Sequence, residues 1–142
     1  MSYCTLDQLT ERFGERALTD LTDRGDEATG EVDSDVIDRA IADTGALIDG
    51  YLKGRYALPI VATPPLLTDL ALTVAFYKLH PHVAPEKVRK DYEDAMRTLR
   101  EISTGAVRLD VAGVEPAASG SSGVKTNDRP RDMTPDNMKG YV

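Results

Sequence analysis

Hydrophobic residues recur at three- and four-residue steps in five stretches, which is the spacing of amphipathic helices. The two short and three long stretches cover about residues 5–14, 15–21, 33–54, 63–79 and 85–105. The first begins with a capping box, because Thr5 and Gln8 have the spacing that satisfies two free amides at once. The 63–79 stretch leaves little polar surface, so we expect it to be the most buried helix.

Glycine and proline separate these stretches. Gly14, Gly54 and Gly105 follow the last apolar residue of a helix, where a left-handed cap is favoured. Thr63 is expected to cap the next helix, with Pro64 in its first turn, where a missing amide costs nothing. The connections are short, so the pattern predicts a mainly α fold. We expect a small antiparallel bundle of three long helices plus one or two short ones, over residues 1–105.

Residues 106–142 differ in pattern and form a second predicted unit, an extended C-terminal arm. "VRLDV", residues 107–111, alternates strictly and predicts one short β-strand carrying Val107, Leu109 and Val111 on one face. A glycine-, serine- and proline-rich linker follows, and then an ending that contains Met133, Met138 and Tyr141. Because a strand needs its amides paired, we expect another chain to supply the partner.

The charge is distributed unevenly. Five of the 17 Lys and Arg and five of the 24 Asp and Glu lie in residues 106–142, so residues 1–105 carry the whole net charge of −7. An acidic body repels nucleic acid phosphates, which argues against tight DNA binding. Cys4 is the single cysteine, so no internal disulfide can form. We expect no secretory signal and no membrane span, since the most apolar stretch has about 16 residues.

The sequence contains two candidate metal sites, and both lack the required ligands. Residues 20–49 hold ten carboxylates, but a calcium loop starting at Asp23 fails at its third, sixth and twelfth positions. His80 and His82 lack the further ligands of a zinc site. No nucleophile elbow, cysteine–histidine pairing or Walker-type phosphate loop is present. We therefore expect a protein without catalytic activity, metal or cofactor.

The elbow, residues 51–65 with the sequence "YLKGRYALPIVATPP", combines two tyrosines and an arginine with three prolines. Two interpretations remain open. Tyr51 and Tyr56 pack the end of the bundle while Arg55 pairs with a carboxylate, or the elbow is a stiff loop that docks on another chain. Tyrosine and arginine are favoured anchors of protein interfaces, and Pro59 stiffens the loop.

Four runs of the sequence resemble the Mu-like prophage head–tail connector family of tailed phages. They are "MSYCTLDQLTERFGERALTDLTDR", "VIDRAIADTGALIDGYLKGRYALPI", "PPLLTDLALTVAFYKL" and "VRKDYEDAMRTLREISTGAVRLDV". The resemblance covers residues 1–111, and "IDGYLKGRYALP" is its most specific part. The ending "RPRDMTPDNMKGY" is also similar, although Met133 stands where relatives tend to carry an aromatic residue.

The resemblance implies a structural virion protein at the head–tail interface, made in the host cytoplasm. The resemblance implies a homo-oligomeric ring of twelve copies in the virion, beneath the portal protein. It completes the DNA-filled head and provides the platform for tail, stopper or terminator proteins, and DNA passes through without specific binding. The expected interface residues are Tyr51, Arg55, Tyr56, Pro59, Val107, Leu109, Val111, Arg131, Met133, Met138 and Tyr141.

Two alternatives belong to other classes. One is a host-type helical module that binds proteins through the same apolar tail. The other is a calcium-responsive or hydrolytic protein that uses the acidic segment 20–49.

Overall fold

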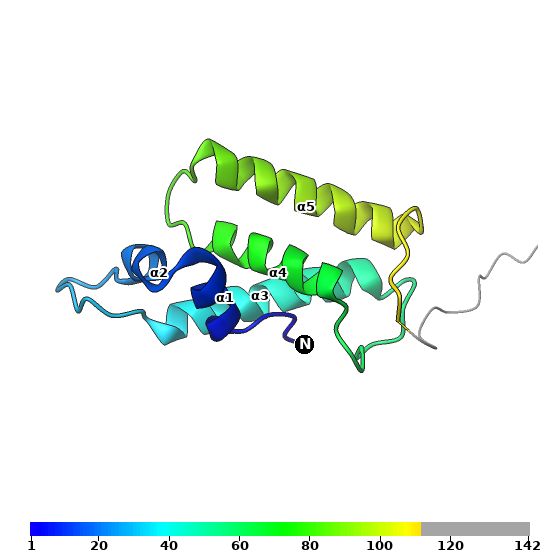
Figure 1. Cartoon of the computed structure of the whole chain (residues 1–142), viewed down its shortest axis with the longest axis horizontal. Coiled ribbons are helices and arrows are strands. Elements are labelled where there is room, and N and C mark those ends of the chain that lie inside the picture. The colour runs from blue at the N-terminus through cyan, green and yellow to red at the C-terminus, as the bar shows by residue number, and fades with distance from the viewer. Residues whose placement is uncertain (112–142) are drawn as a thin grey trace, which may run out of the picture.

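The computed structural model describes residues 1–111, which contain five α-helices (Figure 1). They are α1 (Leu6–Phe13), α2 (Glu15–Thr22), α3 (Ser34–Leu52), α4 (Pro65–Lys78) and α5 (Glu86–Thr104). The predicted mainly α class is confirmed, and of the one or two short helices expected beside the three long ones, two are present. No helix among the described residues is long and apolar enough to cross a membrane.

Local sequence sets most helix ends. The Thr5–Gln8 capping box forms at α1, and Gly105 ends α5 in the left-handed conformation at φ 85°. The cap predicted at Thr63 is wrong by one residue: Pro64 is the N-cap of α4, with φ −61° and ψ 147°. Pro65 explains the difference, because a residue that precedes proline is kept out of the α region.

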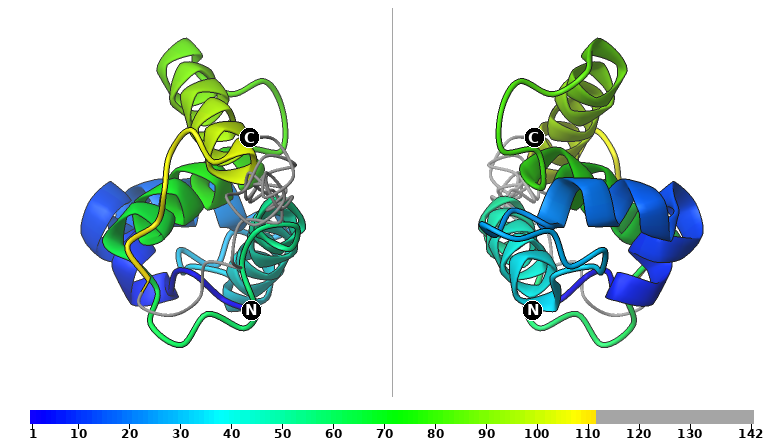
Figure 2. Two further views of the ribbon diagram at one scale, coloured as in Figure 1. Left: turned by 90° about the vertical axis from the view of Figure 1, so that its right-hand side faces the viewer. Right: turned by 90° about the vertical axis from the view of Figure 1, so that its left-hand side faces the viewer.

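The three long helices form the core, and each pair of them is in contact (Figure 1). End-on views show α5 projecting above the layer that contains α3 and α4 (Figure 2). The short α1 packs against α2, α3 and α4. As expected, α4 is deeply buried, and its buried side chains surround most of the helix. They are Leu67, Leu70, Ala71, Leu72, Val74 and Ala75.

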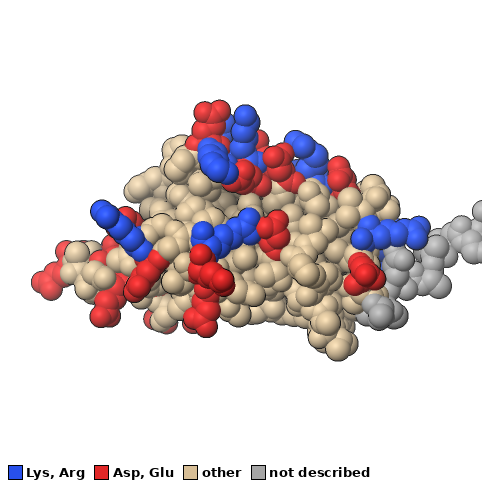
Figure 3. Space-filling view, in the orientation of Figure 1, with Lys and Arg blue, Asp and Glu red and all other residues tan. Residues whose placement is uncertain are grey.

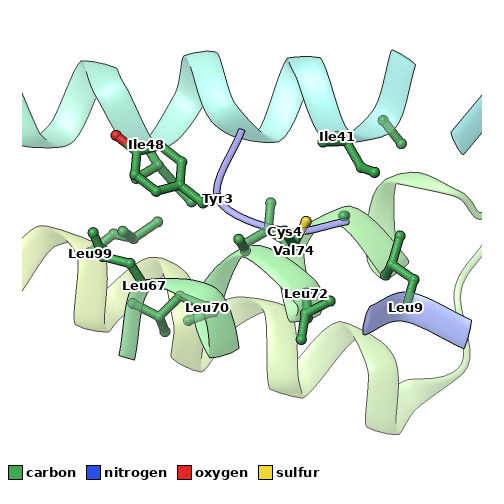
Figure 4. Close-up of a cluster of buried hydrophobic side chains, with 14 of the residues drawn as sticks. Tyr3, Cys4, Leu9, Ile41, Ile48, Leu67, Leu70, Leu72, Val74 and Leu99 are labelled. Carbon is green, nitrogen blue, oxygen red and sulfur yellow. The ribbon is translucent and has the colours of Figure 1, made fainter. Parts of the chain in front are cut away.

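The N-terminal residues before α1 also belong to the core. Tyr3 and Cys4 lie between α3 and α4, beside Ile48 and Val74 (Figure 4). Gly45 allows this arrangement, because a Cβ there would lie 2.0 Å from the backbone oxygen of Met1. The Tyr3 hydroxyl donates a hydrogen bond to Asp49, which fixes the segment against α3.

The predicted β-strand is wrong. Residues 107–111 are not part of a strand, and no β-strand occurs in the described part of the chain. The segment instead follows α5 back onto the helices, where Leu109 is buried and Val107 and Val111 pack against the core. An apolar side chain can be buried against helices without a partner strand, so alternation alone did not distinguish the two outcomes.

Acidic side chains are concentrated in the segment that runs from the end of α2 through α3. Residues 20–49 carry ten Asp and Glu against two Arg, and the loop between α2 and α3 presents Asp26, Glu27 and Glu31 to solvent. This loop is at the left end in Figure 1, and Figure 3 shows acidic groups there. Much of the net charge of −7 therefore resides away from the elbow, which joins α3 to α4 at the opposite end.

Candidate protein interface

The elbow begins as a tight continuation of α3. The backbone amides of Arg55 and Tyr56 both donate to the carbonyl oxygen of Leu52, at 2.9 and 2.8 Å. Tyr56 is thereby turned into the core, where only 2% of its surface is exposed. The Leu58–Pro59 peptide bond is cis, and Ile60 returns to the core. The elbow is therefore an ordered structure, anchored by Tyr56 and Ile60.

Tyr56 holds the start of the C-terminal arm. Its hydroxyl oxygen accepts a hydrogen bond from the backbone amide of Leu109 at 3.0 Å, in a buried setting. Leu109 itself is 7% exposed. The amide of Val107 donates to the carbonyl oxygen of Glu101 at 3.2 Å, and that of Val111 donates to the carbonyl oxygen of Leu109 at 3.0 Å. Three amides of the predicted strand are therefore satisfied within the chain. We call residues 106–111 the arm root, because the remainder of the C-terminal arm follows from them.

Arg55 provides a second connection between the elbow and the end of α5. A Cβ added at Gly105 would lie 2.3 Å from Cζ of Arg55, so the guanidinium group lies directly on the glycine backbone. Gly105 also has a positive φ of 85°, a backbone conformation that residues with a Cβ adopt only at a cost in free energy. Glycine at 105 thus closes α5 and makes room for Arg55. The elbow and the arm root form one continuous surface.

The outer face of the elbow is apolar. No charged residue occurs from Tyr56 to Thr68, a segment we call the uncharged run. Within it Val61 is 93% exposed and Leu66 is 37% exposed, while Pro59 is also exposed. Figure 3 shows the corresponding uncharged projection at the lower right, below the basic groups at that end. Pro59 and Val61 lie on the elbow and Leu66 lies in the first turn of α4, so this part of the chain exposes apolar groups and no charge.

The structure separates the expected interface residues into four groups. Tyr56 and Leu109 belong to the core, so they act by holding the arm root. Tyr51, Arg55, Val107 and Val111 are half-buried around them, and Pro59 is exposed. Arg131, Met133, Met138 and Tyr141 lie outside the described residues.

Val61 and Gly105 were missed as site residues. The long uncharged run was the available signal for Val61. Prolines on both sides of Val61 prevent either neighbouring helix from extending to include it, so Val61 cannot belong to the buried face of a helix. No local pattern indicated the role of Gly105 beside Arg55, because the two residues are 50 positions apart.

The acidic loop has its own internal structure. The Asp23 carboxylate accepts hydrogen bonds from the amides of Thr29 and Gly30, at 3.0 Å or slightly longer. These bonds, that of Gly30 first, lower the pKa of Asp23. Within residues 1–111 no group of three or more His, Cys, Asp or Glu side chains is arranged to hold a metal ion. Asp23 thus closes the turn as a hydrogen-bond acceptor.

The two histidines of the α4–α5 connection have different surroundings. His80 Nδ1 lies 2.9 Å from the carbonyl oxygen of Phe76, and its ring meets the Phe76 ring edge-on at 5.1 Å. His82 is exposed. The structure therefore places His80 at the end of α4 as a packing group, consistent with a favourable position at a helix C-terminus.

The chain is similar to known proteins over the region that contains the elbow and the arm root. It matches the family described as Bacteriophage Mu, Gp36 over residues 3–127. It is 34% identical to gene product J of Escherichia phage Mu over 105 residues, which is 74% of each chain. It is 32% identical to the Mu-like prophage FluMu protein gp36 of Haemophilus influenzae over 92 residues, which is 65% of each chain. The expected relationship to Mu-like phages is confirmed, and the chain belongs to the Bacteriophage Mu Gp36 family.

Proposed function

We propose that this chain is a structural virion protein that connects the head of a Mu-like phage to its tail. It forms a ring of copies beneath the portal protein and acts by binding alone. The observation that carries the proposal is the hydrogen bond between Tyr56 and Leu109, which fixes the root of a 31-residue segment, 112–142, beside an exposed apolar loop. A connector needs such an arrangement, because it must bind several neighbours from one rigid body.

Two further features support the proposal. The segment beyond Val111 is long enough to reach a neighbouring molecule, and it ends in apolar residues that include Met138 and Tyr141. The body has an excess of negative charge, which residues 20–49 contribute. A ring built from such bodies lets DNA pass without binding it, because like charges repel phosphate. The site of action is therefore the head–tail junction of the virion.

A phage that lacks the gene tests the proposal. Heads should fill with DNA but lose it, and electron micrographs should show heads without tails. Expression of the full chain from a plasmid should restore infectious particles. Normal joining of heads and tails in the complete absence of this protein would refute the connector function.

A truncation after Val111 separates the two parts of the chain. It keeps Leu109 and its bond to Tyr56, so circular dichroism should show a folded helical body. The truncated protein should fail to restore particles, because the segment that reaches the neighbour is gone. Full restoration by the truncated protein would contradict a docking role for residues 112–142. It would equally contradict the alternative of a host-type module that binds through the same apolar tail.

A further inference from the structure

A groove with an aromatic wall lies where α1, α4 and α5 meet. The rings of Phe13 and Phe76 stack in parallel with their centres 3.8 Å apart. Together with Val88 of α5 they line a pocket of about 320 Å³, which we call the aromatic groove. Thr73 of α4 lies in this pocket and also in a shallower depression that continues between α4 and α5 to Leu66. That depression is lined mainly by polar and charged side chains, so the apolar surface offered to a partner is concentrated at Phe13, Phe76 and Val88.

The charges at the rim of the aromatic groove pair with one another. Arg12 lies 2.5 Å from Asp69, and Lys87 lies 2.7 Å from Asp91. Arg12 also lies over the Phe13 ring, 5.7 Å from its centre. Since these charges balance, the groove favours an uncharged apolar ligand over an acidic or a basic one. Burial of a charged group there would incur a desolvation cost with little compensation.

The chain itself presents a ligand of this kind. The uncharged run, Tyr56–Thr68, carries Val61 at its tip with 93% of the residue exposed. Pro59, Pro64 and Pro65 restrict the backbone on both sides, so little conformational entropy is lost when the loop docks. Val61 is not among the residues that line its own chain's groove. Within residues 1–111, a single copy therefore leaves both the loop and the groove available.

We propose that Val61 and its neighbours in the uncharged run dock in the aromatic groove of a second copy of this chain. The loop lies between α3 and α4, whereas the groove lies between α1, α4 and α5, so the two contacting surfaces differ. Each copy can then bind one neighbour through its loop and another through its groove. Contacts between unlike surfaces build rings when the rotation closes. The inference rests on the proposed function only for the closure of the ring.

Cross-linking through engineered cysteines tests this contact even when it is weak in solution. Cys4 is buried, with 3% of its surface exposed, so it should contribute little background cross-linking. The double variant Val61→Cys with Thr73→Cys should form a ladder of dimers and longer multimers on oxidation. The matched control is Val83→Cys with Thr73→Cys, because Val83 is 95% exposed on another proline-bounded loop. The control should stay monomeric.

Three results would overturn the proposal. The first is that the control cross-links as efficiently as the Val61 pair, which would show that exposure alone drives the reaction. The second is that the Val61 pair fails to cross-link in purified protein and in assembled particles. The third is that Thr73→Cys instead cross-links to Met138→Cys, which would show that the C-terminal arm occupies the groove.

Complementary variants test whether the two surfaces are unlike. Val61→Asp should abolish docking of the loop, and Thr73→Lys should block the groove with a long cation. Neither variant should form multimers alone in native mass spectrometry. An equal mixture should form a dimer and nothing larger, because one intact loop and one intact groove remain. A mixture that stays monomeric under conditions in which the unmodified chain forms multimers, or either variant forming multimers alone, would contradict the proposal.

The same variants distinguish this contact from the connector function. If Val61→Asp supports normal particles while loss of the whole protein leaves tailless heads, the docking proposal fails and the connector function stands. If heads and tails join without the protein, the connector function fails whatever the cross-linking result. Val83→Asp is the control in the phage assay and should behave like the unmodified chain.

Discussion

The hydroxyl of Tyr56 and the backbone amide of Leu109 are joined by a buried hydrogen bond of 3.0 Å across 53 positions of sequence. Tyr56 is 2% exposed and Leu109 7% exposed, so water cannot replace either partner. This bond fixes the arm root to the elbow. It thereby determines where Val111, the last described residue, lies on the body of the protein.

Tyr56→Phe should destabilise the protein while preserving its packing. Removal of the hydroxyl leaves the buried Leu109 amide without its acceptor, which costs about 1–3 kcal/mol. Urea unfolding should show the loss of stability, and the Leu109 amide should exchange faster with deuterium. Tyr51→Phe is the matched control, because it removes a hydroxyl from a half-buried tyrosine near the elbow. Equal stability of Tyr56→Phe and the unmodified protein would show that the bond contributes nothing.

Gly105→Ala should be more harmful than an ordinary substitution at a positive φ. The left-handed conformation costs a residue with a Cβ about 1–2 kcal/mol. The new methyl would also lie 2.3 Å from Cζ of Arg55, so the guanidinium must move. Gly30→Ala measures the backbone cost alone, since Gly30 has a φ of 73° and nothing within 4 Å of an added Cβ. The midpoint temperature of thermal unfolding should be lower for Gly105→Ala than for Gly30→Ala. The reverse order would count against the Arg55 contact.

Cys4 should react slowly with iodoacetamide at about pH 8, because thiolate is the reactive form. Burial raises the pKa of the Cys4 thiol to about 11, so little thiolate is present. Unfolding in urea should restore the rate of a free cysteine. Rapid labelling of the folded protein would show that residues 1–5 do not hold their place in the core.

Gly45→Ala should release the N-terminal segment. An added Cβ would lie 2.0 Å from the Met1 oxygen, and backbone atoms cannot yield as a flexible side chain can. The Cys4 labelling rate should therefore rise in this variant. Gly50→Ala on the same helix is the control, because nothing lies within 4 Å of its added Cβ. Unchanged labelling in Gly45→Ala would contradict the close approach of Met1 to α3.

The turn between α2 and α3 should loosen at acidic pH. Amide hydrogen bonds lower the pKa of Asp23 in the folded chain. The stabilisation that ionised Asp23 contributes is therefore fully present above the pKa of about 3.9 that it has in the unfolded chain. It is lost as the pH falls through the lower pKa of Asp23 in the folded chain. The amide signals of Thr29 and Gly30 should shift with that transition in an NMR titration. Asp23→Asn should remove the transition, whereas Asp26→Asn, at an exposed residue of the same loop, should retain it.

Helix positions were predictable because their causes are local. The capping box of Thr5, the left-handed cap at Gly105 and the apolar periodicity of α3 each depend on residues within a few positions. The Thr63 cap failed for a local reason as well, since the effect of Pro65 on Pro64 outweighed the preference for threonine. The elbow was likewise recognisable from its prolines and tyrosines.

The sequence by itself determined five helices, a proline-bounded elbow and an apolar ending, because each follows from spacing along the chain. Only the tertiary structure decided that residues 107–111 pack on helices, that Tyr56 lies in the core and that Val61 faces solvent. The aromatic groove likewise needs Phe13, Phe76 and Val88 from three helices. Alternation and aromatic content show which side chains of a segment favour burial. Whether they are buried depends on the surface that helices distant in sequence form beside them.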